Sequence, residues 1–278
     1  MLETRRIVVV TVICILVLTG VLLLAWPGDA KQQPKGRAPS VRLLAHAGAG
    51  IQPPLDELGA MFTEKTGTRI DYSYKGSGCL LPDICVAQKG DLYIPGELFY
   101  MQQGIDRGII TQYRPVAQMS TVLIAQKGNP KGIRGVEDLG RPGTRVGMGD
   151  AKAIAIGRAA KTVLDRAKCA RAVEKNTVMC CMNVVELGNA IKLRQLDAAI
   201  VWDGTAALYG DQITTIPIPA DLRETSTIPV GVLKYSKHPK EATRFMSFLA
   251  SPEAALVFKK HGYQPVKAPV ATAKAKKS

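Results

Sequence analysis

Short apolar segments that alternate with amphipathic helical patterns restrict the fold of this chain more than any other feature. The predicted strands cover residues 41–45, 69–74, 91–94, 116–126, 144–149, 198–202 and 229–233. Helical patterns fill the sequence between them, and strands that alternate with helices are typical of α/β proteins. We therefore predict an α/β fold with mixed, mainly parallel sheets. The strand at 116–126 is long enough to bridge two lobes.

Glycine-rich turns follow three of these strands, after Ala45, after Tyr74 and after Gly147. Such turns open helices, whose first N–H groups are free and whose N-terminal ends carry a partial positive charge. Several such ends that meet at the strand C-termini can bind an anion without a charged side chain. Tight packing alone also explains glycine at these positions. The Gly76-Ser77-Gly78 turn lacks both the first glycine of a nucleophile elbow and the lysine of a phosphate-binding loop.

The composition is that of a globular protein with a basic surface. Hydrophobic residues make up 46% and charged residues 22% of the 278 residues, which excludes disorder over most of the chain. Lys and Arg number 37 against 23 Asp and Glu, so the net charge is +14. The basic residues are dispersed and do not interleave with aromatic residues, so we expect no nucleic-acid partner.

The N-terminus has the pattern of an export segment. Arg5 and Arg6 precede an uncharged run over 7–26, which as a helix would span about 30 Å of membrane. We predict that residues 1–30 are either a cleaved signal peptide or an uncleaved membrane anchor. Both place the rest of the chain in the periplasm or on the extracytoplasmic face. Residues 31–40 are predicted to be a linker and residues 265–278 a disordered basic tail.

Five cysteines follow the apolar run, and an oxidising compartment favours pairing between them. They are Cys79, Cys85, Cys169, Cys180 and Cys181. The pairs nearest in sequence are Cys79 with Cys85, and Cys169 with Cys180 or Cys181. A Cys79–Cys85 bond requires Pro82 to break the helix early. Neither a Cys-x-x-Cys motif nor histidines at metal-ligand spacing occur, so we expect no redox centre, cofactor or cation site.

From about Val41 to Gln264 the chain resembles the periplasmic molybdate- and tungstate-binding proteins of ABC importers, which have the type II solute-binding-protein fold. The motifs that carry the resemblance are Ala47-Gly48-Ala49-Gly50-Ile51, Gly76-Ser77-Gly78, Gly90-Asp91, Gly149-Asp150 with Gly157, Asn183-Val184, Trp202-Asp203, and the closing segments Phe248 to Glu253 and Phe258 to Tyr263. The resemblance implies two lobes, one of residues 41–119 plus 228–264 and one of 120–227. It also implies a hinge near 118–122 and 227–230.

The resemblance further implies a site of neutral donors around a tetrahedral dianion. Its predicted ligand-binding residues are Gly50, Ser77, Ile156, Val184 and Trp202, with Ala49, Gly78 and His46 as further candidates. Ser77 matches a family serine, whereas Gly50 stands where the family commonly has a second serine and Trp202 replaces a tyrosine. An indole N–H can only donate, so these two departures leave the choice among molybdate, tungstate, sulfate and phosphate open.

Two classes of function compete at this point. In the first, a monomeric binding protein captures an oxyanion and delivers it to an ABC permease in the membrane. In the second, an enzyme or thiol-redox protein uses Ser77 or the cysteines, but no base stands in a recognisable motif with them. A membrane-anchored ligand sensor on the same fold is a third possibility. The first class fits the residues best, so we expect no enzymatic activity.

Overall fold

The computed structural model describes residues 41–266. The predicted signal or anchor at 1–30, the linker at 31–40 and all but the first two residues of the predicted tail lie outside this range. The described residues form a mixed α/β fold, as predicted. Their strands are ordered β2-β1-β3-β9-β4-β7-β5-β6, and β8 pairs with β4. No helix within 41–266 is both long enough and apolar enough to cross a membrane.

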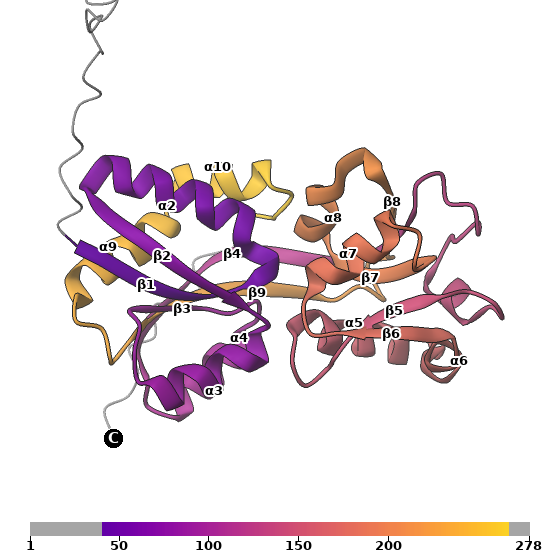
Figure 1. The fold of residues 1–278 in the computed structure, drawn as a ribbon, viewed down its shortest axis with the longest axis horizontal. Coiled ribbons are helices and arrows are strands. Elements are labelled where there is room, and N and C mark those ends of the chain that lie inside the picture. Colours follow the sequence, from indigo (N-terminus) through magenta and orange to yellow (C-terminus); the bar gives the residue numbers. More distant parts are fainter. Residues whose placement is uncertain (1–40, 267–278) are drawn as a thin grey trace, which may run out of the picture. The chain divides into compact units, whose positions relative to one another are not determined.

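The first lobe contains a parallel sheet core flanked by helices (Figure 1). Its elements are β1 (Val41–Gly48), the 3₁₀ turn η1 (Ala49–Ile51), α2 (Gln52–Thr66), β2 (Thr68–Lys75), α3 (Ser77–Ala87), β3 (Leu92–Ile94), α4 (Leu98–Asp106), α9 (Pro239–Leu249) and α10 (Pro252–Lys260). Strand β1 pairs in parallel with both β2 and β3. The carboxyl ends of these strands therefore meet at one edge, where the glycine-rich turns begin.

The second lobe repeats this arrangement with its own sheet. Its elements are η2 (Val136–Gly140), β5 (Val146–Gly149), α5 (Ala155–Arg166), α6 (Ala170–Asn176), β6 (Thr177–Cys181), α7 (Val184–Lys192), β7 (Ala198–Trp202), α8 (Asp203–Tyr209), η3 (Gly210–Gln212) and β8 (Ile213–Pro217). Strand β5 pairs in parallel with β6 and β7. The sequence had not distinguished β6, β8, α6 or α8 as separate elements.

Two long strands, β4 (Ile110–Gln126) and β9 (Thr225–Leu233), join the lobes. Strand β4 pairs antiparallel with β9 from Ile110 to Ser120, with β7 from Thr121 onward and with β8 from Val122 onward. The antiparallel pairs all involve β4 or β9, because these strands run back between two otherwise parallel sheets. The lobe boundaries at 119/120 and 227/228 remain predictions.

The C-terminal helices pack on the first lobe. Helix α2 begins with two prolines in its first turn, buries Leu55, Leu58 and Phe62 on one face, and ends at Gly67 in the left-handed conformation, with φ +70°. The Phe62 ring lies 4.9 Å from that of Phe245 and 5.5 Å from that of Phe248, both on α9. These aromatic contacts attach the end of the chain to its beginning.

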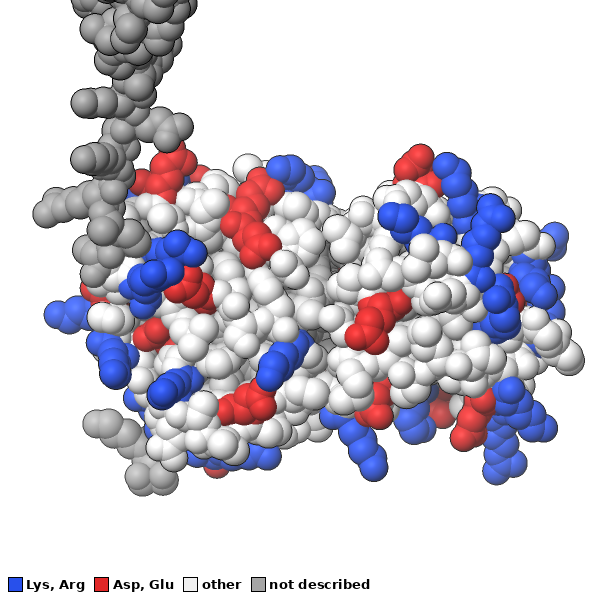
Figure 2. Space-filling model, viewed as in Figure 1, with Lys and Arg blue, Asp and Glu red and all other residues white. Residues whose placement is uncertain are grey.

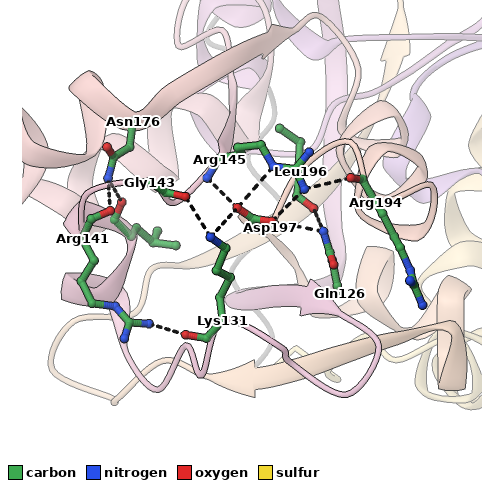
Figure 3. Close-up of polar contacts among 10 residues, drawn as sticks. Gln126, Lys131, Arg141, Gly143, Arg145, Asn176, Arg194, Leu196 and Asp197 are labelled. Carbon is green, nitrogen blue, oxygen red and sulfur yellow. Dashed lines mark hydrogen bonds and ion pairs between the residues drawn. The ribbon is translucent and has the colours of Figure 1, made fainter.

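A buried carboxylate fixes the sheet of the second lobe (Figure 3). Asp197, only 4% exposed, accepts hydrogen bonds from the backbone N–H of Arg145 at 2.8 Å, from its guanidinium at 2.8 Å and from Gln126 at 3.2 Å. Burial opposes ionisation of Asp197, but the bonds from Arg145 outweigh it and hold the pKa of this carboxyl below its usual value. The network links the start of β5, the start of β7 and the end of β4.

The predicted Cys79–Cys85 disulfide is wrong for this structure. All five cysteines of residues 41–266 are free thiols. Helix α3 continues through Pro82, so six residues separate Cys79 and Cys85 by about 9 Å along one axis. Cys169 likewise forms no disulfide bond with Cys180 or Cys181. Burial raises the pKa of the Cys181 thiol to about 12, which keeps it protonated.

Candidate functional site

A small cavity lies between the two lobes, at the carboxyl ends of the strands. It has a volume of about 30 Å³ and receives residues from η1, the starts of α3, α5 and α7, and the end of β7. The lining residues are Gly48, Ala49, Gly50, Ile51, Lys75, Gly76, Ser77, Gly96, Met119, Ile154, Ala155, Ile156, Asn183, Val184 and Trp202. None of these is acidic, and Lys75 is the one charged residue among them. We call this space the small cavity.

All five residues predicted to bind the ligand line the small cavity. Gly50 and Ser77 come from the first lobe, and Ile156, Val184 and Trp202 come from the second. The further candidate Ala49 also lines it, whereas Gly78 and His46 do not. The structure thus brings together segments that are up to 152 residues apart in the sequence, from Gly50 to Trp202.

Three helices begin at the small cavity, and each leaves backbone donors there. Ser77 is the first residue of α3, Ile156 the second of α5 and Val184 the first of α7. Within residues 41–266 the backbone N–H groups of these three residues have no hydrogen-bond partner. Three helix N-termini therefore point free donors and partial positive charge at one small space, which is the arrangement that favours an anion.

Ser77 is held so that its hydroxyl can donate. The residue is 4% exposed, and its Oγ accepts a hydrogen bond of 3.0 Å from the N–H of Gly96. Tyr93 also donates to the Ser77 carbonyl at 3.3 Å, which fixes the turn. Because Gly96 occupies a lone pair of Oγ, the hydroxyl proton remains for a ligand.

A steric clash explains why position 50 is glycine where the family commonly has a serine. A Cβ at this position would lie 2.9 Å from Cγ1 of Val184, which is too close unless Val184 moves. The Gly50 carbonyl accepts a hydrogen bond from the Tyr263 hydroxyl, which ties η1 to the end of the chain. The backbone of η1 and the start of α7 thus approach each other across the small cavity.

Gly76 and Gly78 allow the two lobes to come into contact. A Cβ on Gly78 would lie 2.5 Å from the carbonyl oxygen of Lys152, and one on Gly76 would lie 2.5 Å from Cγ2 of Ile154. The N–H of Gly78 donates to the carbonyl of Ala153 at 2.9 Å, so it is not available to a ligand. The predicted turn therefore acts at Gly78 as a contact between lobes rather than as a ligand donor.

His46 packs away from the small cavity. Its Nε2 lies 3.1 Å from the carbonyl oxygen of Lys89 and 2.6 Å from where a Cβ of Gly90 would stand. Burial lowers its pKa, so the ring is neutral at pH 7. His46 is thus a strand-end histidine of β1 that bonds to backbone, and it is not part of the site.

Several lining residues were not among the predicted ligand-binding residues, although Asn183 belongs to one of the motifs of the resemblance. Lys75 ends β2 and forms an ion pair of 2.5 Å with Asp83, while Met119 and Ile154 supply apolar walls. Asn183 caps α7 by accepting from the N–H of Val185 at 2.9 Å, and so orients the free N–H of Val184. Only Asn183 carried a recognisable signal, because asparagine is a preferred N-cap residue.

A family model described as bacterial extracellular solute-binding protein matches residues 43–264. The chain belongs to this family. A putative binding protein of Haemophilus influenzae is 26% identical to it over 225 residues, which cover 81% of this chain and 91% of that protein. The molybdate-binding protein ModA of Mycobacterium tuberculosis is 22% identical over 223 residues, covering 80% and 84%.

Solved structures show the same fold for this solute-binding protein. The periplasmic molybdate-binding protein of Azotobacter vinelandii superimposes with a TM-score of 0.72 at 16% identity. The match covers 81% of this chain and all of the Azotobacter chain. At this identity the likeness establishes the two-lobed type II periplasmic-binding fold, while the ligand has to be argued from the small cavity itself.

Proposed function

We propose that this protein captures a tetrahedral oxyanion, molybdate or tungstate, outside the cytoplasm and delivers it to an ABC permease. One observation supports this most directly: three helix N-termini, each with an unpartnered N–H, meet the Ser77 hydroxyl at a cavity with no acidic lining residue. A dianion stripped of water needs hydrogen bonds to each of its oxygens, and backbone N–H groups at helix ends supply them.

The size of the small cavity favours a compact ion. One water needs about 10–15 Å³ of such space, so about 30 Å³ accepts two to three water-sized groups. The volume of a four-oxygen anion is of this order. A sugar or an amino acid is larger and requires a wider separation of the lobes. The family resemblance and the molybdate-binding relatives support molybdate or tungstate as the proposed ion, and a sulfate-binding relative of Synechococcus elongatus makes sulfate the main competitor.

The contacts of Ser77 favour binding over catalysis. A serine nucleophile needs a general base within hydrogen-bond reach. The partner of Ser77 Oγ is instead the N–H of Gly96, which cannot accept a proton. Among the described residues that line the small cavity there is no histidine, aspartate or glutamate. The hydroxyl is thus arranged as a donor to a bound acceptor.

We further propose that the lobes close on the ligand by bending where β4 and β9 cross between them. Residues 41–119 plus 228–264 would move against residues 120–227, with hinge points near 118–122 and 227–230. The described arrangement has the lobes in contact, because Gly78 donates to Ala153 across the interface. Hinge closure around a ligand is the expected motion for two lobes joined by two strands. Export by residues 1–30 and action as a monomer complete the proposal.

Binding to a panel of anions tests the proposed function. Molybdate, tungstate, sulfate and phosphate are titrated into the protein by calorimetry, and the melting temperature is recorded at saturation. We expect one tight site for molybdate or tungstate and a rise in melting temperature of several degrees for the tightest ligand. A tighter site for sulfate or phosphate would keep the oxyanion class and change the ion. Absence of binding for all four would overturn the proposal.

A further inference from the structure

A second and larger cavity lies at the same lobe interface and shares no residue with the small cavity. Its volume is about 340 Å³, and its walls come from α3, α4, the loop at 151–152 and α5. We call it the basic cavity, because Arg107, Lys152 and Arg158 line it and none of its described lining residues is acidic. Its size is within the range of sites for small organic molecules.

The positive charges of the basic cavity are only partly compensated. Arg158 forms an ion pair of 3.3 Å with Glu97, and its guanidinium stacks 3.6 Å above the ring of Phe99. Arg107 and Lys152 have no ion-pair partner within residues 41–266. Two free cations and one stacked guanidinium around one space attract an anion of more than one charge.

A buried hydroxyl in the same wall independently indicates a ligand. Tyr100 is 3% exposed, lines the basic cavity, and its hydroxyl has no hydrogen-bond partner among the described residues. A buried polar group without a partner is costly, so native structures rarely retain one without a water, ion or ligand to satisfy it. Burial also raises the pKa of Tyr100 to about 12, so at neutral pH the hydroxyl keeps its proton and can donate.

Apolar groups form the remainder of the wall. Pro82 on α3 is exposed, and the ring of Phe99, which is 44% exposed, stands beside the Arg158 guanidinium. An inorganic ion would leave these surfaces in contact with water, whereas a molecule with a flat apolar body would cover them. The lining therefore combines a cationic end with an apolar side.

We propose that the basic cavity binds a small organic dianion, a phosphomonoester with a flat apolar body. Arg107, Lys152 and the Tyr100 hydroxyl contact the phosphate, and Phe99 and Pro82 contact the body. Tyr100 and Arg107 belong to α4 and its end, whereas Lys152 and Arg158 belong to the second lobe, so this ligand bridges the lobes. A ligand that bridges the lobes stabilises their closed arrangement and so raises the affinity of the small cavity for its oxyanion, and the coupling is reciprocal.

Phenyl phosphate is the probe that tests this site. It is titrated by calorimetry into the full chain, in mild detergent, with and without saturating molybdate. We expect one phenyl phosphate per chain in both titrations and at least threefold tighter binding when molybdate is present. Inorganic phosphate and neutral benzyl alcohol are expected to bind at least tenfold more weakly. Should molybdate itself fail to bind, the titration without it still tests the basic cavity, so the two proposals fail separately.

The affinity of substituted proteins for phenyl phosphate shows which residues form the site. Arg107→Gln with Lys152→Gln should weaken phenyl phosphate about hundredfold, and Tyr100→Phe about tenfold, by removing charge-assisted and neutral donors. Lys89→Gln, an exposed lysine outside both cavities, and Ser77→Ala should leave it unchanged. The proposal is overturned by absence of binding at millimolar probe, by one-for-one displacement of molybdate or by full binding in the double variant. An affinity for inorganic phosphate equal to that for phenyl phosphate, both measured in saturating molybdate, would also overturn it.

Discussion

The small cavity and the basic cavity lie at one lobe interface, and they differ in the groups that make their electrostatic potential positive. The small cavity relies on backbone N–H groups at three helix starts, with Lys75 as its single charged lining residue. The basic cavity relies on the side chains of Arg107, Lys152 and Arg158. Backbone donors are fixed by the fold and cost little side-chain entropy, so they suit a compact ion that must be fully desolvated. Long cationic side chains adapt to larger and more varied anions.

Charges of both signs are spread over the face of the molecule shown in Figure 2. On the face shown in Figure 2, Lys and Arg are interspersed with Asp and Glu over both lobes. The difference between the two sites described above lies in the residues that line them. Each experiment below changes one residue or one condition on which the difference between the two cavities depends.

Replacing Gly78 by Ala should have the largest effect. The added Cβ would stand 2.5 Å from the Lys152 carbonyl and so oppose contact between the lobes, which should weaken oxyanion binding about hundredfold. Gly104→Ala is the matched control, because its Cβ would meet Ile110 within the first lobe, at 2.9 Å. It should lower the melting temperature and leave the affinity unchanged. Equal affinities for Gly78→Ala and the wild type would show that closure does not depend on this contact.

Ser77→Ala should lower the affinity for the oxyanion about ten- to hundredfold. One hydrogen bond to a buried dianion is lost, which costs on the order of 1–3 kcal/mol at ~1.4 kcal/mol per decade of affinity. Ser73→Ala on β2, outside the small cavity, is the control and should change nothing. Calorimetry of both variants provides the measurement, and an unchanged Ser77→Ala affinity would remove Ser77 from the site.

Trp202→Phe should lower the affinity for the oxyanion about tenfold. The substitution keeps an aromatic ring at the end of β7 and removes the indole N–H, the only donor of that side chain. The affinity for phenyl phosphate should stay at the wild-type value, since Trp202 does not line the basic cavity. A parallel loss for both ligands would mean that Trp202 acts through lobe closure instead of through its N–H.

Glu97 stands between the cavities and should make stability depend on pH. It follows Gly96 of the small cavity and pairs with Arg158 of the basic one, and burial raises its pKa to about 7 despite that partner. Because the folded pKa lies above the unfolded value, the contribution to stability is present at low pH and is lost as pH rises through about 7. Between pH 6 and 8 the wild type should lose about 1 kcal/mol relative to Glu97→Gln.

Denaturant unfolding at several pH values measures this difference. Glu64→Gln, an exposed residue of α2, is the control and should run parallel to the wild type. Parallel pH curves for the wild type and Glu97→Gln would show that Glu97 titrates outside this range.

Salt should affect the two cavities unequally, and this is the smallest effect expected for the oxyanion. Raising ionic strength from about 0.05 to 0.3 M should change molybdate affinity less than twofold, because its donors are neutral and enclosed. Phenyl phosphate should weaken several-fold over the same range, because exposed cations hold it. Equal salt dependence would contradict the division between neutral and charged sites.

Local sequence patterns predicted the fold class, because strand ends and helix starts follow from them. The five residues that meet at the small cavity were predicted from the family resemblance and not from these patterns. Turns such as Gly76-Ser77-Gly78 mark where donors are free. The sequence did not predict that Gly78 contacts Lys152 and Ala153, since a close approach between residues 74 positions apart leaves no local signal. The Cys79–Cys85 expectation failed because Pro82 is accommodated one turn into α3. The basic cavity depends on α4 meeting the 151–158 segment, which no local pattern records.

The position of a bound tungstate tests the central claim most directly. A crystal of the protein grown with tungstate, measured at the tungsten absorption edge, locates the metal from its anomalous signal. We predict one strong peak in the small cavity, with tungstate oxygens within hydrogen-bond distance of Ser77 Oγ and of the N–H groups of Ile156 and Val184. A peak confined to the basic cavity, or none in a crystal whose lobes are in contact, would contradict the account.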